Sequence, residues 1–115
     1  MTWFSKSKPE KSPEPPLLTG YRHPAIGAVI GEAIDLLDDI YAPDRRVWCN
    51  KNYALLERIY KAVEEAYGES ERLRIGSIIQ GVIIPMGHTD LNDWEPARAA
   101  TWAVVERLIK LEQKP

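Results

Sequence analysis

Apolar side chains recur every three or four residues through most of the chain, which places them on one face of an α-helix. The clearest case follows Pro24, a residue favoured in the first turn of a helix. We predict a helix from Pro24 to about Ile40, stopped by Pro43. Its apolar residues fall in one arc of about 160°: Ile26, Val29, Ile30, Ala33, Ile34, Leu36, Leu37, Ile40 and Tyr41.

Two further segments have the same helical spacing of apolar residues. Either Asn50 or Asn52 is a suitable cap for a second helix, which is expected to end at Tyr67 because Gly68 follows as a natural stop. Asp93 is the expected cap of a last helix that runs toward the C-terminus, with a proline in its first turn. Half of each helical wheel is apolar, so both helices should cover a common core.

The segment 70–84 is ambiguous in composition but not in spacing. Isoleucine, valine and two glycines would also suit a strand. The apolar positions nevertheless follow intervals of three and four rather than two, so we predict a helix that Pro85 ends. The residues that share its apolar face are Ile75, Ile78, Ile79, Val82 and Ile83.

Two glycines inside the first predicted helix have a cost. Gly27 and Gly31 each destabilise a helix interior by about 1 kcal/mol relative to alanine. Close approach of another backbone is the usual compensation, so we expect a neighbouring chain segment to pack tightly there. Packing inside the domain is favoured over a seam between two copies.

The chain before the first helix has a different character. Residues 5–16 contain four prolines among lysine, serine and glutamate, and this composition predicts a disordered, partly polyproline II tether. Trp3 and Phe4 stand at its tip. They either fold back onto the domain, stay exposed, or anchor in a groove of a partner. We therefore divide the chain into a disordered Pro-rich tail, residues 1–19, and an all-α domain, residues 20–115, built as an up-and-down bundle of about four helices.

Composition and charge narrow the functional classes. The 115 residues suffice for one domain, and 17 acidic against 15 basic side chains give a net charge of -2, unlike a histone-like nucleic-acid binder. A single cysteine excludes an intramolecular disulfide. No apolar run approaches the roughly 20 residues of a membrane span, and no signal peptide is evident, so we expect a soluble, cytoplasmic protein.

The charges are unevenly distributed along the chain. Residues 1–22 carry a net charge of +2, and residues 23–44 carry -5. Adjacent blocks of opposite sign either neutralise each other within the fold or create a dipolar surface that associates head to tail.

Reactive side chains are present but do not form a convincing catalytic set. Glu32, Asp35 and Asp39 share one helical stripe that could hold Mg²⁺ or Mn²⁺, although a solvated acidic face is the favoured interpretation. Cys49 has arginines nearby but no adjacent histidine to act as a base. Two histidines, interpreted as turn and cap residues, make a zinc site improbable. We predict no catalytic residue, no metal ligand and no cofactor.

One local cluster combines basic and aromatic side chains: Arg45, Arg46, Trp48 and Lys51. Such a cluster can contact phosphates and stack on a base, it can form the centre of a protein interface, or Trp48 can simply plug the end of the bundle. The sequence leaves these three interpretations open.

The function that the sequence favours is a non-enzymatic protein–protein interaction module: an adaptor, an assembly factor or a small subunit of a larger complex. A domain of this size buries a limited core, so binding a partner or self-association is expected to add stability. The predicted partner-binding residues are Trp3, Phe4, Arg45, Arg46, Trp48 and Lys51. The alternatives are a helical nucleic-acid-binding subunit that uses the Arg/Trp/Lys cluster, and a divalent-metal-dependent hydrolase that uses the acidic stripe.

Overall fold

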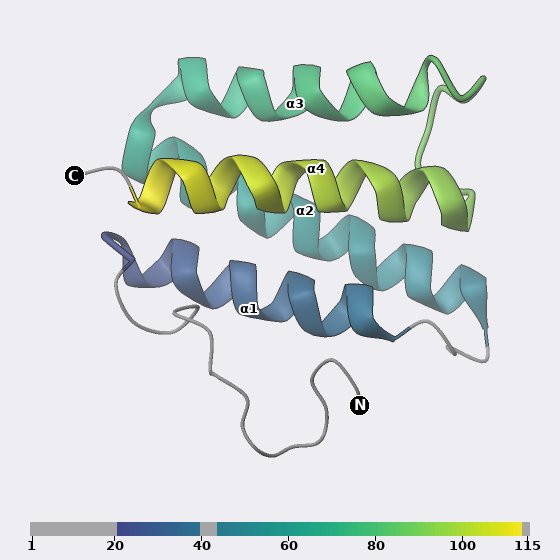
Figure 1. Ribbon diagram of the computed structural model, residues 1–115, viewed down its shortest axis with the longest axis horizontal. Helices are drawn as coiled ribbons and strands as arrows, with labels where there is room; N and C mark the ends of the chain where they lie inside the picture. The colour runs from purple at the N-terminus through teal and green to yellow at the C-terminus, as the bar shows by residue number, and fades with distance from the viewer. Residues whose placement is uncertain (1–20, 40–43, 114–115) are drawn as a thin grey trace.

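The computed structural model describes residues 21–39 and 44–113, and these ranges form four helices and no strand (Figure 1). The all-α prediction and the number of helices are therefore confirmed. The predicted disordered tail lies outside the described residues. The four helices are α1 (Pro24–Asp38), α2 (Arg45–Tyr67), α3 (Glu69–Ile83) and α4 (Trp94–Gln113).

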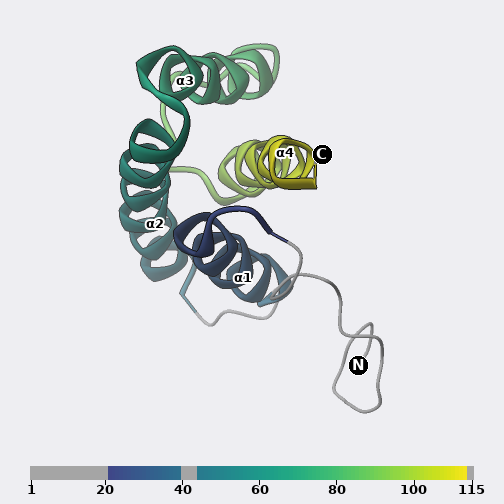
Figure 2. The ribbon, with the colours of Figure 1, turned by 90° about the vertical axis from the view of Figure 1, so that its left-hand side faces the viewer.

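The helices form an up-and-down bundle. Each helix runs antiparallel to the next, and α2 passes obliquely behind α4 (Figure 1). Consecutive helices pack against each other, α4 returns to pack on α1, and α2 also contacts α4 across the middle. The view along the bundle shows α1 and α3 on opposite sides of this central pair (Figure 2), and they do not touch each other. Thus α2 and α4 are the two central helices, and each contacts all of the other three.

Each helix contributes its predicted apolar face to one core. Ile30, Ile59 and Val104 are completely buried, and they come from α1, α2 and α4 respectively. The ambiguous segment is a helix: Ile75, Ile79 and Ile83 lie one turn apart along α3 and are buried, as the intervals in the sequence predicted. None of the helices in the described ranges combines the length and apolar character needed to cross a lipid bilayer.

The start of α2 differs from the prediction. Neither Asn50 nor Asn52 caps it, because the Asp44 side chain accepts hydrogen bonds from the backbone N–H groups of Arg46 (2.9 Å) and Val47 (3.4 Å) and begins the helix at Arg45. The two additional turns bring Trp48 into the core. Asn52 is fully buried instead, and its side-chain oxygen accepts a hydrogen bond from the Thr101 hydroxyl (2.7 Å).

The sequence predicted the role of Gly68 but not the contact that Gly27 makes. The side chain of Tyr21, rather than another backbone, approaches Gly27, since a Cβ there would stand 3.0 Å from the Tyr21 ring. Gly68 alone joins α2 to α3, with a φ of 99° that favours glycine. The predicted stop at Gly68 is confirmed.

The buried Asn52–Thr101 pair generates a stability prediction. Thr101→Val removes the donor and leaves the Asn52 amide without its one hydrogen bond, which should lower the free energy of unfolding by about 1–3 kcal/mol. The double variant Asn52→Leu with Thr101→Val should lie within about 1 kcal/mol of the parent, because no polar group then remains unpaired. Urea titration of the three proteins checks this; a double variant less stable than Thr101→Val would contradict it.

Candidate functional site

The structure divides the predicted basic-aromatic cluster between core and surface. Trp48 is only 1% exposed, and its indole N–H donates to the backbone carbonyl of Leu36 (2.8 Å), so it ties the start of α2 to the end of α1. Arg45, Arg46 and Lys51 are exposed on the first two turns of α2. The Trp48 ring is thus enclosed in this conformation, whereas the three cations remain accessible. The other two predicted residues, Trp3 and Phe4, lie outside the described residues.

A stack of arginine and tryptophan side chains closes this end of the bundle. The Arg45 guanidinium lies 4.1 Å from the centre of the Trp94 ring, and the Arg98 guanidinium lies 5.0 Å from it. Arg98 also lies 5.7 Å from the Trp48 ring, which meets Trp94 edge to face at 6.4 Å. Such contacts contribute about 0.5–2 kcal/mol each. The stack connects the beginnings of α2 and α4.

Arg98 is held in a partly desolvated environment. Burial lowers its pKa, while the carboxylates of Asp38 and Asp39 at the end of α1 act in the opposite direction. One of its terminal nitrogens is buried without a hydrogen-bond partner. The guanidinium is therefore positioned by aromatic rings and by the acidic end of α1, on the wall of a hollow between α1 and α4.

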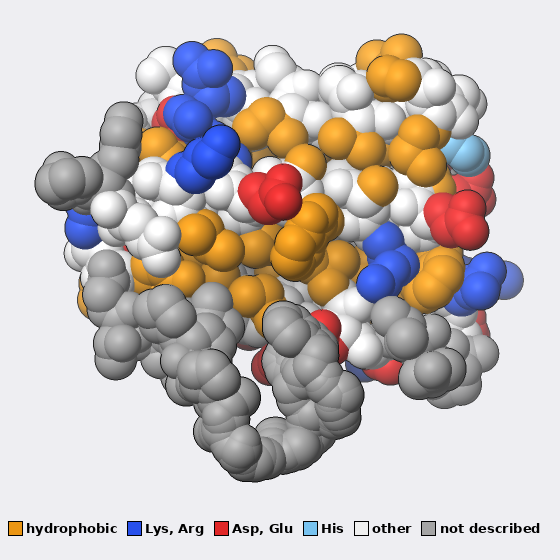
Figure 3. Space-filling view, viewed as in Figure 1, with side chains coloured by type: hydrophobic (Ala, Val, Ile, Leu, Met, Phe, Trp, Pro, Cys, Tyr) orange, Lys and Arg blue, Asp and Glu red, His pale blue; other side chains and the backbone are white. Residues whose placement is uncertain are grey.

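This hollow is the candidate site. We call the five residues that line it, which are named at the end of this paragraph, the Trp102 surface. The hollow is shallow and open to solvent, with a volume of about 360 Å³. Trp102 is 50% exposed at its edge, a large aromatic ring facing solvent. Figure 3 shows apolar side chains gathered over the middle of this face, with basic side chains toward both ends. The lining residues are Leu37, Asp38, Arg98, Ala99 and Trp102.

The Trp102 surface combines apolar, aromatic and charged side chains. Leu37 and Ala99 supply apolar contact area, and Asp38 and Arg98 supply one charge of each sign. Tryptophan and arginine are the residue types that contribute most at the centres of protein interfaces.

The opposite end of the bundle holds a buried carboxylate that we call the Glu112 clasp, formed by Glu112, His23 and Tyr67. Glu112 is 1% exposed and accepts hydrogen bonds from the His23 backbone N–H (2.7 Å), from His23 Nδ1 (2.8 Å) and from the Tyr67 hydroxyl. The His23 ring packs edge-on against Tyr67, with 4.9 Å between ring centres. The clasp thereby joins the start of α1 to the ends of α2 and α4.

The clasp shifts the acidity of its members in opposite directions. Burial alone would raise the pKa of Glu112, but the hydrogen bonds from Tyr67 and His23 outweigh it, so the pKa lies below its ordinary value. Burial, the hydrogen bond to Glu112 and its negative charge raise the pKa of Tyr67 to about 12. Glu112 is therefore charged and Tyr67 neutral at pH 7.

The sequence predicted that the two histidines are turn and cap residues, and His23 is at the N-cap position of α1. His23 is the residue before α1, although its side chain binds Glu112 instead of capping the helix. His88 lies in the loop between α3 and α4, where its Nδ1 is 3.0 Å from a carboxylate oxygen of Asp93.

Glu32 and Cys49, two of the reactive side chains noted in the sequence, are paired or buried. Both carboxylate oxygens of Glu32 accept hydrogen bonds from Arg58, and these bonds lower the pKa of Glu32. Within residues 21–39 and 44–113, no three histidine, cysteine or acidic side chains gather in a way that could hold a metal ion. Cys49 is only 6% exposed, and burial raises the pKa of its thiol, the reverse of activation.

Sequence reasoning missed the residues that form the site. Trp102 lies at the margin of the apolar face of its helix, and this marginal position is the only sign of its exposure in the sequence. Trp94, Arg98 and Glu112 depend on partners in other helices, and the sequence contained no sign of those contacts.

Comparison of the chain with protein families, with curated proteins and with solved structures finds no match.

The Glu112 clasp should make stability depend on acidity. Because folding lowers the pKa of Glu112, its contribution is present above the ordinary carboxyl value and is lost as the pH falls through the lowered pKa. Glu112→Gln should cost about 1–3 kcal/mol at pH 7, and the difference from the parent should shrink as the pH falls below about 4. Urea titrations across this range measure it.

The matched control for this experiment is Tyr67→Phe. It removes one of the three hydrogen bonds but leaves His23 on the carboxylate, so it should destabilise the protein while retaining the dependence on pH. A difference between Glu112→Gln and the parent that stays constant down to strong acid would contradict the clasp.

Cys49 should be an unreactive thiol. Its burial and raised pKa predict that a disulfide reagent reacts with the native protein at least about 100-fold more slowly than with the chain in concentrated urea. The absorbance of the released thiolate follows both reactions. A native rate equal to or above that of the unfolded chain would instead indicate an activated cysteine.

Proposed function

We propose that this protein is a non-enzymatic protein–protein interaction module, of the adaptor, assembly-factor or small-subunit kind, and that it binds a partner through the Trp102 surface. The observation that carries the proposal is the half-exposed Trp102 ring beside a hollow lined by both apolar and charged side chains. A ring in this position contributes little to the core that it borders, but a partner could cover it.

The size of the Trp102 ring makes it a credible anchor. A tryptophan side chain has an area of about 150–250 Å², and half of it remains exposed here. Covering on the order of 100 Å² of apolar area contributes roughly 2–3 kcal/mol. That value reaches the level at which single residues dominate an interface.

Charged groups around the ring can provide specificity. Asp38 and Arg98 stand within the hollow, and Glu106 and Lys110 are exposed farther along α4. A partner would need charges of opposite sign facing each of these four side chains. Such matching determines how the partner is aligned on the surface and adds little to its affinity.

Two features weigh against the alternative functions. A nucleic-acid site would have the exposed Arg45, Arg46 and Lys51, but Trp48, the ring that the sequence offered for stacking, is enclosed. A metal-dependent hydrolase would need the acidic stripe, in which Glu32 is already paired with Arg58. Neither alternative is supported by a specific contact comparable to the Trp102 surface.

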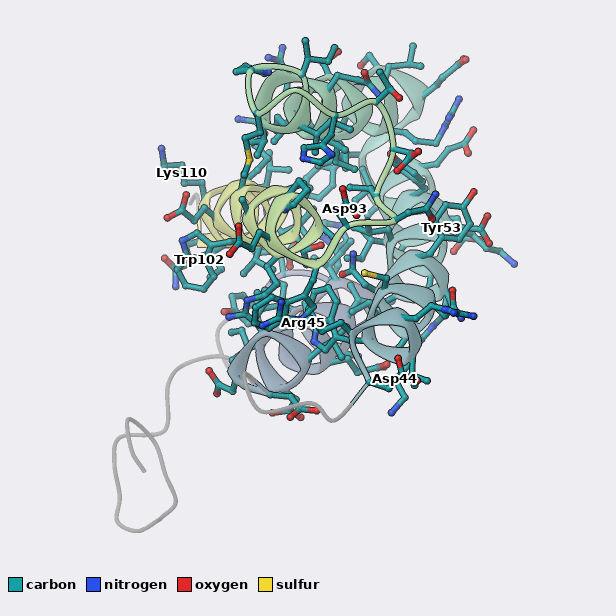
Figure 4. The ribbon with its side chains drawn as sticks, turned by 90° about the vertical axis from the view of Figure 1, so that its right-hand side faces the viewer. Asp44, Arg45, Tyr53, Asp93, Trp102 and Lys110 are labelled. Carbon is teal, nitrogen blue, oxygen red and sulfur yellow. The ribbon has the colours of Figure 1, made fainter. Side chains whose placement is uncertain are left out.

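The test compares two exposed aromatic residues. Trp102 is 50% exposed and Tyr53 is 57% exposed, and the two side chains lie on opposite sides of the bundle (Figure 4). A partner is first identified by affinity capture with the full chain, and its affinity is then measured by calorimetry. Trp102→Ala should weaken binding about 30-fold, corresponding to roughly 2 kcal/mol, whereas Tyr53→Ala should leave it unchanged.

The two variants should melt close to the parent, since both side chains are largely outside the core. Equal affinity of the parent and Trp102→Ala for every captured protein would refute the proposed surface. Loss of binding in Tyr53→Ala alone would place the interface on the other side of the bundle.

A further inference from the structure

We propose that the Trp102 surface also has an occupant within the same chain: Trp3 and Phe4, at the tip of the N-terminal tail. These two residues lie outside the described ones, and the proposal concerns where they bind. Docking would cover Trp102 until a partner displaces them. The competition with a partner rests on the proposed function, whereas the docking itself does not.

The Glu112 clasp determines where the tail begins. His23 is hydrogen-bonded to Glu112 near the end of α4, and Tyr21 packs on Gly27 in the first turn of α1. The chain before residue 21 therefore starts beside the two helices that line the hollow. Trp102 is ten residues before Glu112 in α4, about 15 Å along the helix axis, and Leu37 is about 21 Å from His23 along α1.

The length of the tail fits this span. Phe4 and His23 are nineteen positions apart, and a coil of that length has a root-mean-square end-to-end distance of about 24 Å. The effective concentration of a tethered group is highest when this distance matches the gap between the sites, and it reaches the order of 1 mM for short linkers. A weak aromatic contact is sufficient under these conditions.

The charges of the tail and of the end of α1 are complementary. Residues 1–19 carry a net charge of +1, and Lys6 and Lys8 stand two and four positions after Phe4. Residues 23–44 carry -5; Asp38 lines the hollow, and Asp35 and Asp39 are exposed in the last turn and at the C-cap of α1. The lysines would thus lie against the acidic end of α1 while the rings occupy the space beside Leu37, Ala99 and Trp102.

The tethered tail is favoured over the tail of a second copy. At micromolar protein, a second copy offers its tail at about a thousandth of the millimolar effective concentration of the attached one. If a contact made by two aromatic residues has a dissociation constant of about 1 mM, roughly half of the molecules are covered by their own tail at any time.

The indole N–H resonance of Trp102 in the full-length chain tests the docking. The resonance is assigned with Trp102→Phe. The double variant Trp3→Ala with Phe4→Ala should move it, because the rings would no longer lie beside it, and the resonance of the enclosed Trp48 should stay in place. Lys6→Glu with Lys8→Glu should move it part of the way in the same direction. The control is Ser5→Ala with Ser7→Ala, which should leave it unchanged.

Two results would overturn the inference. One is an unchanged Trp102 resonance in the aromatic double variant; the other is a change in that resonance that disappears when the protein is diluted, which would assign the bound tail to a second copy.

Partner affinity separates this inference from the proposed function. Removing a tail that covers half of the molecules should tighten partner binding about two-fold. If Trp102→Ala abolishes binding but the resonance never responds to the tail, only the docking fails. If the resonance responds and Trp102→Ala binds normally, only the proposed function fails.

Discussion

The buried carboxylate of Glu112 is the interaction on which the arrangement of the bundle depends. Among the described residues, it is the one charged side chain that is almost completely buried, and three hydrogen bonds compensate for its lost hydration. Through His23 and Tyr67 it joins three helix ends. Because α1 does not touch α3, α1 is positioned by α2 and α4 alone, and the clasp fixes it to both.

The other end of α1 is held by different chemistry. The Trp48 indole donates to the carbonyl of Leu36, and the arginine and tryptophan stack keeps the starts of α2 and α4 together. Contacts at both of its ends thus hold α1 beside α4, and these two helices line the hollow. The proposed binding of a partner, and the proposed docking of the tail, both use the surface between them.

Short-range patterns predicted the fold well, and long-range contacts account for what they missed. The spacing of Ile75, Ile79 and Ile83 was enough to identify α3. The helical wheel of a single helix could not show that Trp48 is buried and Trp102 is half exposed. The exposure of each ring depends on whether another helix covers that edge of the apolar face. Glu112 resembles any acidic residue near a chain end until His23, eighty-nine positions away, is placed beside it.

The single-residue joint at Gly68 has a consequence for stability. No residue but this glycine separates α2 from α3, and its φ is 99°. No atom outside its own chain neighbours lies within 4 Å of a Cβ built there, so a side chain would find open space but an unfavourable backbone conformation. An L-residue at this position would therefore strain the corner that returns α3 to α2 and α4, and the burial of Ile75, Ile79 and Ile83 would have to offset that strain.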